Sequence, residues 1–124
     1  MTATAVNEKL ATCAQEYQKL QQDLSGAIDS LRTLQSQLTE NQNVQTEFDR
    51  LEEGANIYKL ESSVLRKKDA ADAKMEVISR ISFLKQQIEG LEKDIQAKQG
   101  KVKEKQNQLA QLQIQVQSHQ HPQK

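Results

Sequence analysis

The sequence has few of the residues that build globular cores and tight turns. Its 124 residues include one cysteine, one proline, four glycines and no tryptophan, and only 3% are aromatic. With 35% hydrophobic residues the chain has too little apolar bulk for a globular core, and its length allows one domain at most. The single cysteine, Cys13, excludes an internal disulfide and favours the reducing cytosol or nucleus.

An excess of one charge is also lacking. Seventeen basic and seventeen acidic residues give a net charge of zero, whereas a nucleic-acid-binding protein normally has a basic surface. The sequence contains no apolar run long enough to span a membrane, and no charged start followed by an apolar secretion segment. We therefore expect a cytoplasmic protein with neither nucleic acid nor membrane among its partners.

The residues that are present suit long exposed helices, since Gln, Lys, Glu, Leu and Ala predominate. In the first half, apolar residues recur in steps of four and three, which is the seven-residue repeat of a helix packed against a partner helix. We predict a helix over residues 5–52, roughly 70 Å long, with Gly54 as its stop. Asn41 occupies an apolar slot and the pattern resumes one residue early at Val44, which predicts a local overwinding called a stammer. The stripe comprises Val6, Leu10, Cys13, Tyr17, Leu20, Leu24, Ala27, Leu31, Leu34 and Leu38, then Val44, Phe48 and Leu51.

A matching stripe in the second half predicts a second helix over residues 70–118, with Asp69 as its N-cap. Two arms of equal length joined by so short a connection fold back as an antiparallel pair. The stripe comprises Val77, Ile81, Leu84, Ile88, Leu91, Ile95, Lys98, Val102, Lys105, Leu109, Leu112 and Val116.

Equal distances from the centre of the chain set the expected register of the two arms. They place Leu34 opposite Leu91 and Leu20 near Lys105. Lys98 and Lys105 occupy apolar slots, where we expect their stems to cover the contact while their ammonium groups reach water.

Residues 53–69 break the helical step, because apolar residues alternate one by one in "NIYKLESSVLRKKD". This spacing predicts a β-hairpin with its turn at Ser62 and Ser63, although an irregular loop is the alternative. A two-stranded ribbon is marginal alone and exposes unpaired edges, so the hairpin would be stabilised by joining hairpins of other chains. The predicted oligomerisation residues are Ile57, Tyr58, Leu60, Val64 and Leu65.

The stretches "LTENQNVQTEF" at 38–48 and "NIYKLESSVLRKKDAADAK" at 56–74, with heptads around them, resemble the β-type subunits of prefoldin, most closely subunit 6. The chain departs from that family at the turn, where "ESS" replaces an apolar residue, Gly and Pro, and at Arg66, where an aliphatic residue is common. The resemblance implies a mostly α fold, a single domain over 1–124, in which a long antiparallel two-helix coiled coil carries a central β-hairpin that joins an oligomeric β-barrel.

The same resemblance implies the function of a hetero-hexameric chaperone. Two α-type and four β-type subunits would hold unfolded or nascent proteins, including actin and tubulin, and deliver them to the cytosolic chaperonin without nucleotide. Client contact is expected near the free ends, on residues for which packing within the coiled coil is the alternative role. These residues are Val6, Leu10, Leu109, Leu112, Ile114 and Val116, of which Ile114 lies off the stripe.

Nothing in the sequence suggests catalysis. It contains no phosphate-binding loop and no nucleophile set, so we expect neither enzyme activity nor a cofactor. His119 and His121 lie in a tail, 119–124, that we expect to be flexible and unable to fix a metal ion. The competing function is a purely structural coiled-coil tether or rod, which would explain both arms but not the alternating centre.

Overall fold

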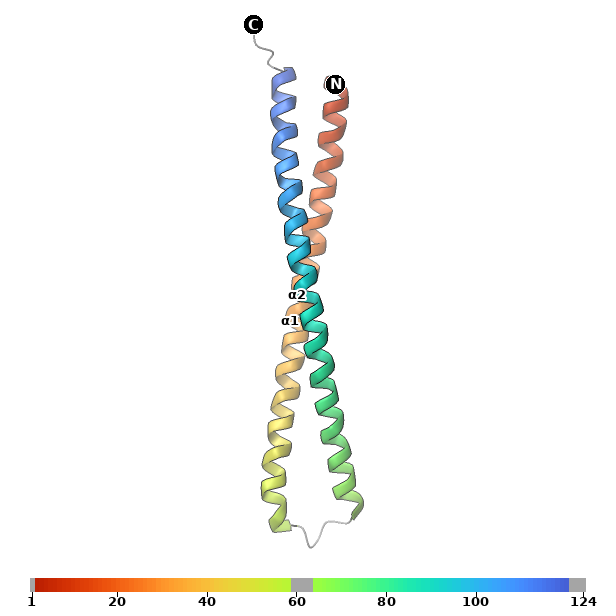
Figure 1. Ribbon diagram of the computed structural model, residues 1–124, viewed down its shortest axis with the longest axis vertical. Coiled ribbons are helices and arrows are strands. Elements are labelled where there is room, and N and C mark those ends of the chain that lie inside the picture. The colour runs from red at the N-terminus through yellow and green to blue at the C-terminus, as the bar shows by residue number, and fades with distance from the viewer. Residues whose placement is uncertain (1, 59–63, 121–124) are drawn as a thin grey trace. The chain divides into compact units, whose positions relative to one another are not determined.

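The computed structural model describes residues 2–58 and 64–120, with side chains described for residues 2–51 and 70–118. These residues form two helices, α1 from Ala3–Tyr58 and α2 from Val64–Gln120 (Figure 1). No strand occurs in this part of the chain. The composition accounts for the helices, since most residues in both are strong helix formers.

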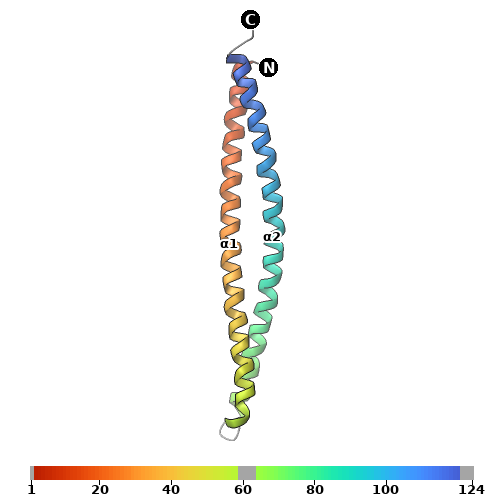
Figure 2. The same cartoon turned by 90° about the vertical axis from the view of Figure 1, so that its left-hand side faces the viewer.

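The chain divides into two compact units, each containing one segment from each helix. Unit 1 comprises residues 1–29 and 92–124, and unit 2 comprises residues 30–91. Within each unit the two segments run antiparallel and lie side by side (Figures 1 and 2). In unit 1, the beginning of α1 and the end of α2 lie at the same end of the unit. The predicted two-helix antiparallel packing is therefore confirmed.

Thr2 explains where α1 begins. The Ala5 backbone N–H donates to Thr2 Oγ1 at 3.1 Å, and the Val6 N–H donates to the Thr2 carbonyl oxygen at 3.1 Å. A threonine that binds the N–H three residues later is a typical N-cap, because it satisfies a donor that the first helical turn leaves free. The helix consequently starts at Ala3, slightly before the predicted start at residue 5.

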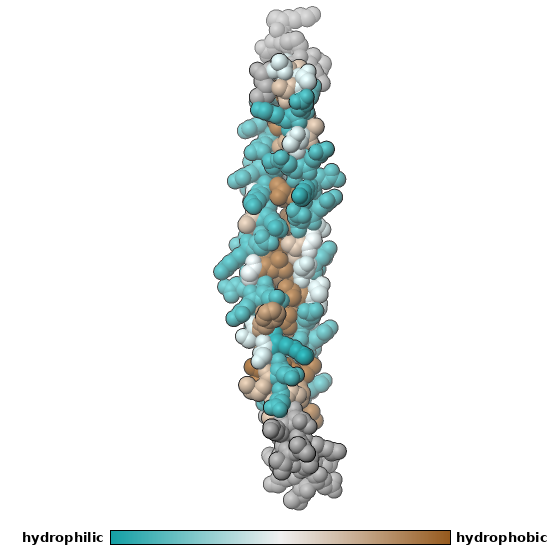
Figure 3. Space-filling view, turned by 90° about the vertical axis from the view of Figure 1, so that its right-hand side faces the viewer, coloured by the Kyte–Doolittle hydropathy of each residue, from teal (hydrophilic) through white to brown (hydrophobic). Residues whose placement is uncertain are grey.

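The seam, meaning the buried stripe between the helices, follows the sequence prediction closely on α2. All twelve predicted positions are buried or half-buried, and every other residue between 75 and 118 is exposed. The best covered apolar side chains of α2 are those of Val77, Ile81, Leu84, Ile88 and Ile95. Figure 3 shows the consequence on one face, where apolar residues form a narrow band among polar side chains.

On α1 the predicted stammer is wrong. Asn41, Gln45 and Phe48 are half-buried, whereas Val44 is 38% exposed and Leu51 is 65% exposed. Continuing in steps of four and three from Leu38 leads to those three residues, so the heptad runs on without a break. The helix keeps its phase and accepts polar side chains in the seam. Asn41 Nδ2 donates to the Gln37 carbonyl oxygen at 2.7 Å, which satisfies the amide locally.

The structure also differs from the prediction at the centre of the chain. Helix α1 continues past Gly54 to Tyr58, and α2 begins at Val64, before the predicted cap at Asp69. Ile57, Tyr58, Val64 and Leu65 are helical here and not in strands. Leu60 and the predicted turn at Ser62 and Ser63 lie outside the described residues. A lone chain offers no neighbouring strands, whereas extending a helix adds one backbone hydrogen bond per residue.

Candidate functional site

The helix ends of unit 1 contain the residues predicted to contact clients. The structure separates this set by exposure: the side chain of Val6 is 2% exposed, and that of Ile114 is 65% exposed. The other four, Leu10, Leu109, Leu112 and Val116, are half-buried in the seam. Ile114 is thus directly accessible, whereas contact with Val6 requires the helix ends to separate.

A groove of about 600 Å³ runs along the same part of unit 1. Its apolar lining comes from Ala5, Cys13 and Leu112, and both helices contribute polar groups around it. Leu112 is the one predicted client-contact residue in this lining. The remaining lining residues are Glu8, Lys9, Thr12, Glu16, Lys105, Gln108, Gln111 and Gln115. Heptad analysis did not predict the groove, because periodicity identifies which side chains face the partner helix but not where they leave space.

Lys105 links the two helices beside this groove. Its ammonium group forms an ion pair with Glu16 of α1, and the lysine side chain is only 22% exposed. The hydrogen bond from Lys105 to Glu16 raises the pKa of Lys105 above its ordinary value, and the charge of Glu16 acts in the same direction. Lys105 thus lies opposite Glu16 and Cys13. The predicted neighbour, Leu20, was wrong by about one helical turn.

Cys13 occupies the seam next to this ion pair. The thiol is free and the residue is 5% exposed. Its Sγ lies 3.9 Å from the carbonyl oxygen of Lys105 and 4.0 Å from Oε1 of Gln108. A buried thiol with two weak acceptors packs as a small apolar side chain.

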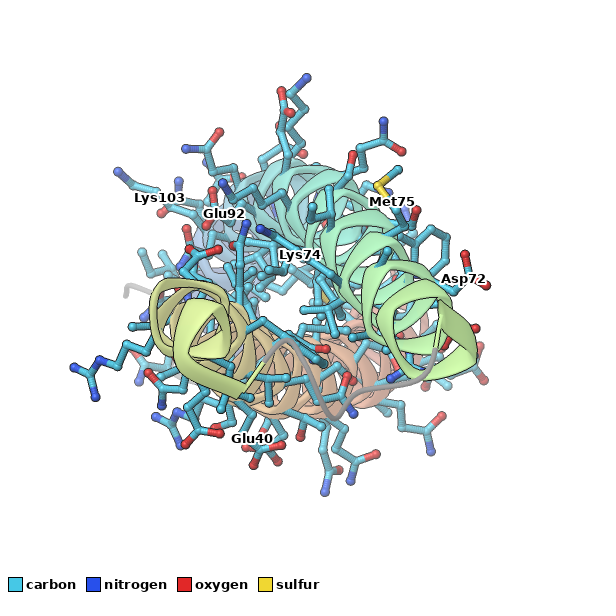
Figure 4. All side chains as sticks on the ribbon, turned by 90° about the horizontal axis from the view of Figure 1, so that it is seen from below. Glu40, Asp72, Lys74, Met75, Glu92 and Lys103 are labelled. Carbon is cyan, nitrogen blue, oxygen red and sulfur yellow. The ribbon has the colours of Figure 1, made fainter. Side chains whose placement is uncertain are left out.

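Two further lysines lie at seam positions. Lys98, in unit 1, binds Asp94 one turn earlier on α2, with Nζ 3.3 Å from Oδ2, and its side chain is 28% exposed. Lys98 is thus half-buried at its seam position, while its ammonium group pairs with the half-exposed carboxylate of Asp94. In unit 2, Lys74 points toward α1 and binds Asp49 at 3.0 Å, whereas Asp72 and Met75 point away from α1 (Figure 4). Lys74 was not predicted, although one further step of three back from Val77 would have identified it.

Unit 2 also carries large apolar side chains on its surface. Leu51 is 65% exposed, Met75 61%, Phe83 57% and Ile78 37%. These residues flank the segment predicted to drive assembly. Of the predicted oligomerisation residues, Ile57, Tyr58, Val64 and Leu65 have only their helical backbone described, and Leu60 lies outside the described residues.

Within residues 2–51 and 70–118, no cluster of three or more His, Cys, Asp or Glu side chains could hold a metal ion. Neither helix, where its residues are described, includes a stretch apolar enough to cross a membrane.

Comparison with known proteins gives a consistent result. The sequence profile of the Prefoldin subunit family matches residues 12–117. The chain is 36% identical over 97 residues to Prefoldin subunit 6 of Saccharomyces cerevisiae, covering 78% of this chain and 85% of the yeast protein. It is 32% identical over 117 residues to Prefoldin subunit 6 of Arabidopsis thaliana, covering 94% of this chain and 91% of the plant protein. It is 30% identical over 115 residues to Prefoldin subunit 6 of Mus musculus, covering 93% of this chain and 91% of the mouse protein. No solved structure matches the chain.

Proposed function

Because the chain belongs to the prefoldin subunit family, we propose that it is one subunit of a hetero-hexameric, ATP-independent chaperone that holds unfolded proteins. The observation that carries this proposal is the family match across residues 12–117, which spans both helices and the segment between them. The accessible apolar surface at the free helix ends of unit 1 supports it, because a chaperone that holds clients without nucleotide needs weak, adaptable apolar contacts. We place the protein in the cytoplasm, with α-type and β-type prefoldin subunits as its partners.

Residues 53–69 would join the subunits. In the assembly this segment would form the β-hairpin that its alternation predicts and contribute it to a shared β-barrel, since neighbouring strands would supply the pairing that the lone chain lacks. The exposed apolar residues of unit 2 on either side support an assembly contact at this end.

Replacing Leu60 and Leu65 together with Asp tests this joint. We expect the variant to keep its helical circular dichroism and to be absent from the hexamer when it is mixed with the other subunits and measured by native mass spectrometry. The matched control replaces two exposed helix residues, Gln86 and Gln96, with Asp and should assemble normally. Normal assembly of the Leu60→Asp, Leu65→Asp variant would show that the hairpin is not the joint.

Client contact is proposed for the predicted residues of unit 1, with Ile114 and the groove residue Leu112 as the accessible members. We expect Ile114→Ser to weaken the suppression of aggregation of an unfolded client by the assembled hexamer. Val44→Ser is the control, because Val44 is also an exposed apolar residue but belongs to unit 2. If both substitutions had the same effect, exposed apolar area in general, and not the free ends, would hold the client.

Actin and tubulin as clients, and delivery to the cytosolic chaperonin, follow from the family resemblance. Purification of the tagged full-length chain from a lysate should recover the other prefoldin subunits together with these partners. A structural tether is the alternative function. It would form a dimer by itself in native mass spectrometry, whereas a prefoldin subunit would enter a mixed hexamer.

A further inference from the structure

Apolar burial alone leaves the register of unit 1 ambiguous. The seam repeats every seven residues, so sliding one helix by a heptad places seam positions opposite seam positions again. Such a slip would offset the helix ends by about 10 Å and change which side chains form the groove. The connection between the two helices also restricts the register, and a polar contact within unit 1 would add to that selection.

The ion pair between Lys105 and Glu16 distinguishes the observed register from one shifted by seven residues. A slip by seven residues in one direction puts Lys9 where Glu16 now meets Lys105, which exchanges an attraction for a repulsion. A slip in the other direction puts Asp23 there, so the pair opposes one slip much more than the other. Polar residues at seam positions are known to select register at a cost in stability.

We propose that the Lys105–Glu16 pair is a register determinant of unit 1, holding Cys13 opposite Gln108 and preventing a one-heptad slip toward Lys101. The position of Lys105 supports this role: its side chain is 22% exposed, and its ammonium group pairs with a carboxylate on the other helix. The buried Cys13 lies within 4.0 Å of Gln108, which makes its thiol a built-in probe of the register.

Disulfide exchange between Cys13 and a second introduced cysteine measures the register in the full-length chain. A disulfide between Cys13 and the cysteine of Gln108→Cys reports the observed register. The Lys101→Cys variant reports the slip that brings Lys105 next to Lys9. The Gln115→Cys variant reports the slip in the opposite direction. The effective concentration of each thiol pair is measured in a glutathione buffer, with and without Lys105→Glu. Cys13 is common to all three thiol pairs, so a change in its own reactivity caused by Lys105→Glu cancels in the ratio of two effective concentrations.

We expect Lys105→Glu to raise the effective concentration of the thiol pair in the Lys101→Cys variant and to lower it in the Gln108→Cys variant. The ratio of the two effective concentrations should change by about fivefold, as for a partly exposed ion pair converted into a like-charge pair. Combining Glu16→Lys with Lys105→Glu should restore most of the effective concentration of the thiol pair in the Gln108→Cys variant.

Lys103→Glu is the matched control, because it makes the same charge change at an exposed position of α2, and it should leave the ratio unchanged. The proposal would be overturned if Lys105→Glu left the ratio of the two effective concentrations unchanged. An equal fall in the effective concentrations of all three thiol pairs would also overturn it. The pair would then stabilise unit 1 without selecting its register.

Discussion

Three glycines lie inside the helices where alanine would fit. Gly26, Gly90 and Gly100 are helical, and a methyl group added at each would meet no other atom within 4 Å. Glycine in a helix interior costs about 1 kcal/mol relative to alanine, because it loses more backbone freedom on folding. Each Gly→Ala substitution should therefore raise the free energy of unfolding by about 1 kcal/mol. Gly90 and Gly100 are about 15 Å apart along α2, so their effects should add.

Urea unfolding followed by circular dichroism measures this gain. For slopes of about 1–3 kcal/mol per molar urea, each substitution should raise the midpoint by about 0.3–1 M. Ala97→Gly, at an exposed position of the same helix, is the reverse control and should lower the midpoint by a similar amount. A lower midpoint for Gly100→Ala would refute the reasoning, because it would mean that the backbone there is not helical or that the space beside it is filled.

Three further predictions concern the seam and the helix ends. Gln45→Leu should stabilise unit 2 by about 1 kcal/mol by burying apolar surface in the seam, whereas Gln42→Leu, at an exposed position, should change the urea midpoint little. Because the pKa of Lys105 is raised, its ionisation stabilises the folded chain fully below the ordinary lysine pKa of 10.5, and this contribution disappears as the pH rises through the folded-state pKa. In alkaline titrations of stability, Glu16→Gln should remove that part of the pH dependence, and an identical profile in the variant would contradict this assignment. Under the proposed function several arms would grip one client, so deleting residues 1–12 and 108–124 should leave the hexamer intact but reduce client holding only in part. Full holding by the truncated hexamer would place client contact elsewhere.

From Val77 onward the seam of α2 could be predicted completely because its apolar residues obey one repeat, and even its lysines at 98 and 105 fall on that repeat. The seam of α1 was predicted correctly as far as Leu38 and again at Phe48. Between Leu38 and Phe48, the polar residues Asn41 and Gln45 face the partner helix while the apolar Val44 is exposed. The apolar residues therefore do not mark the buried positions here. The stammer was predicted because the apolar Val44 was assigned to the seam. The continuous helix instead kept its phase, because a polar amide can be satisfied by a carbonyl of its own helix and a change of phase would disturb every later contact.

Ion pairs and the groove depend on register, which periodicity fixes only to within seven residues. Lys105 was recognised as a seam residue from sequence, but its partner Glu16 depends on the relative shift of the two helices in unit 1. The same holds for Lys74 and Asp49 in unit 2. Such partners become predictable only when a polar contact or the connection between the helices defines the register.

The central segment shows most clearly what one chain cannot determine. The alternation around Tyr58 and Leu65 predicts strands, yet both residues are helical in the isolated chain. A helix satisfies its backbone groups within the segment, whereas a strand needs a neighbour on each side for the same purpose. The helical state is thus favoured wherever neighbours are absent, even for a sequence patterned as a hairpin. Under the proposed function the assembly supplies those neighbours, so strand formation at residues 53–69 would depend on the partner subunits and would be coupled to their binding.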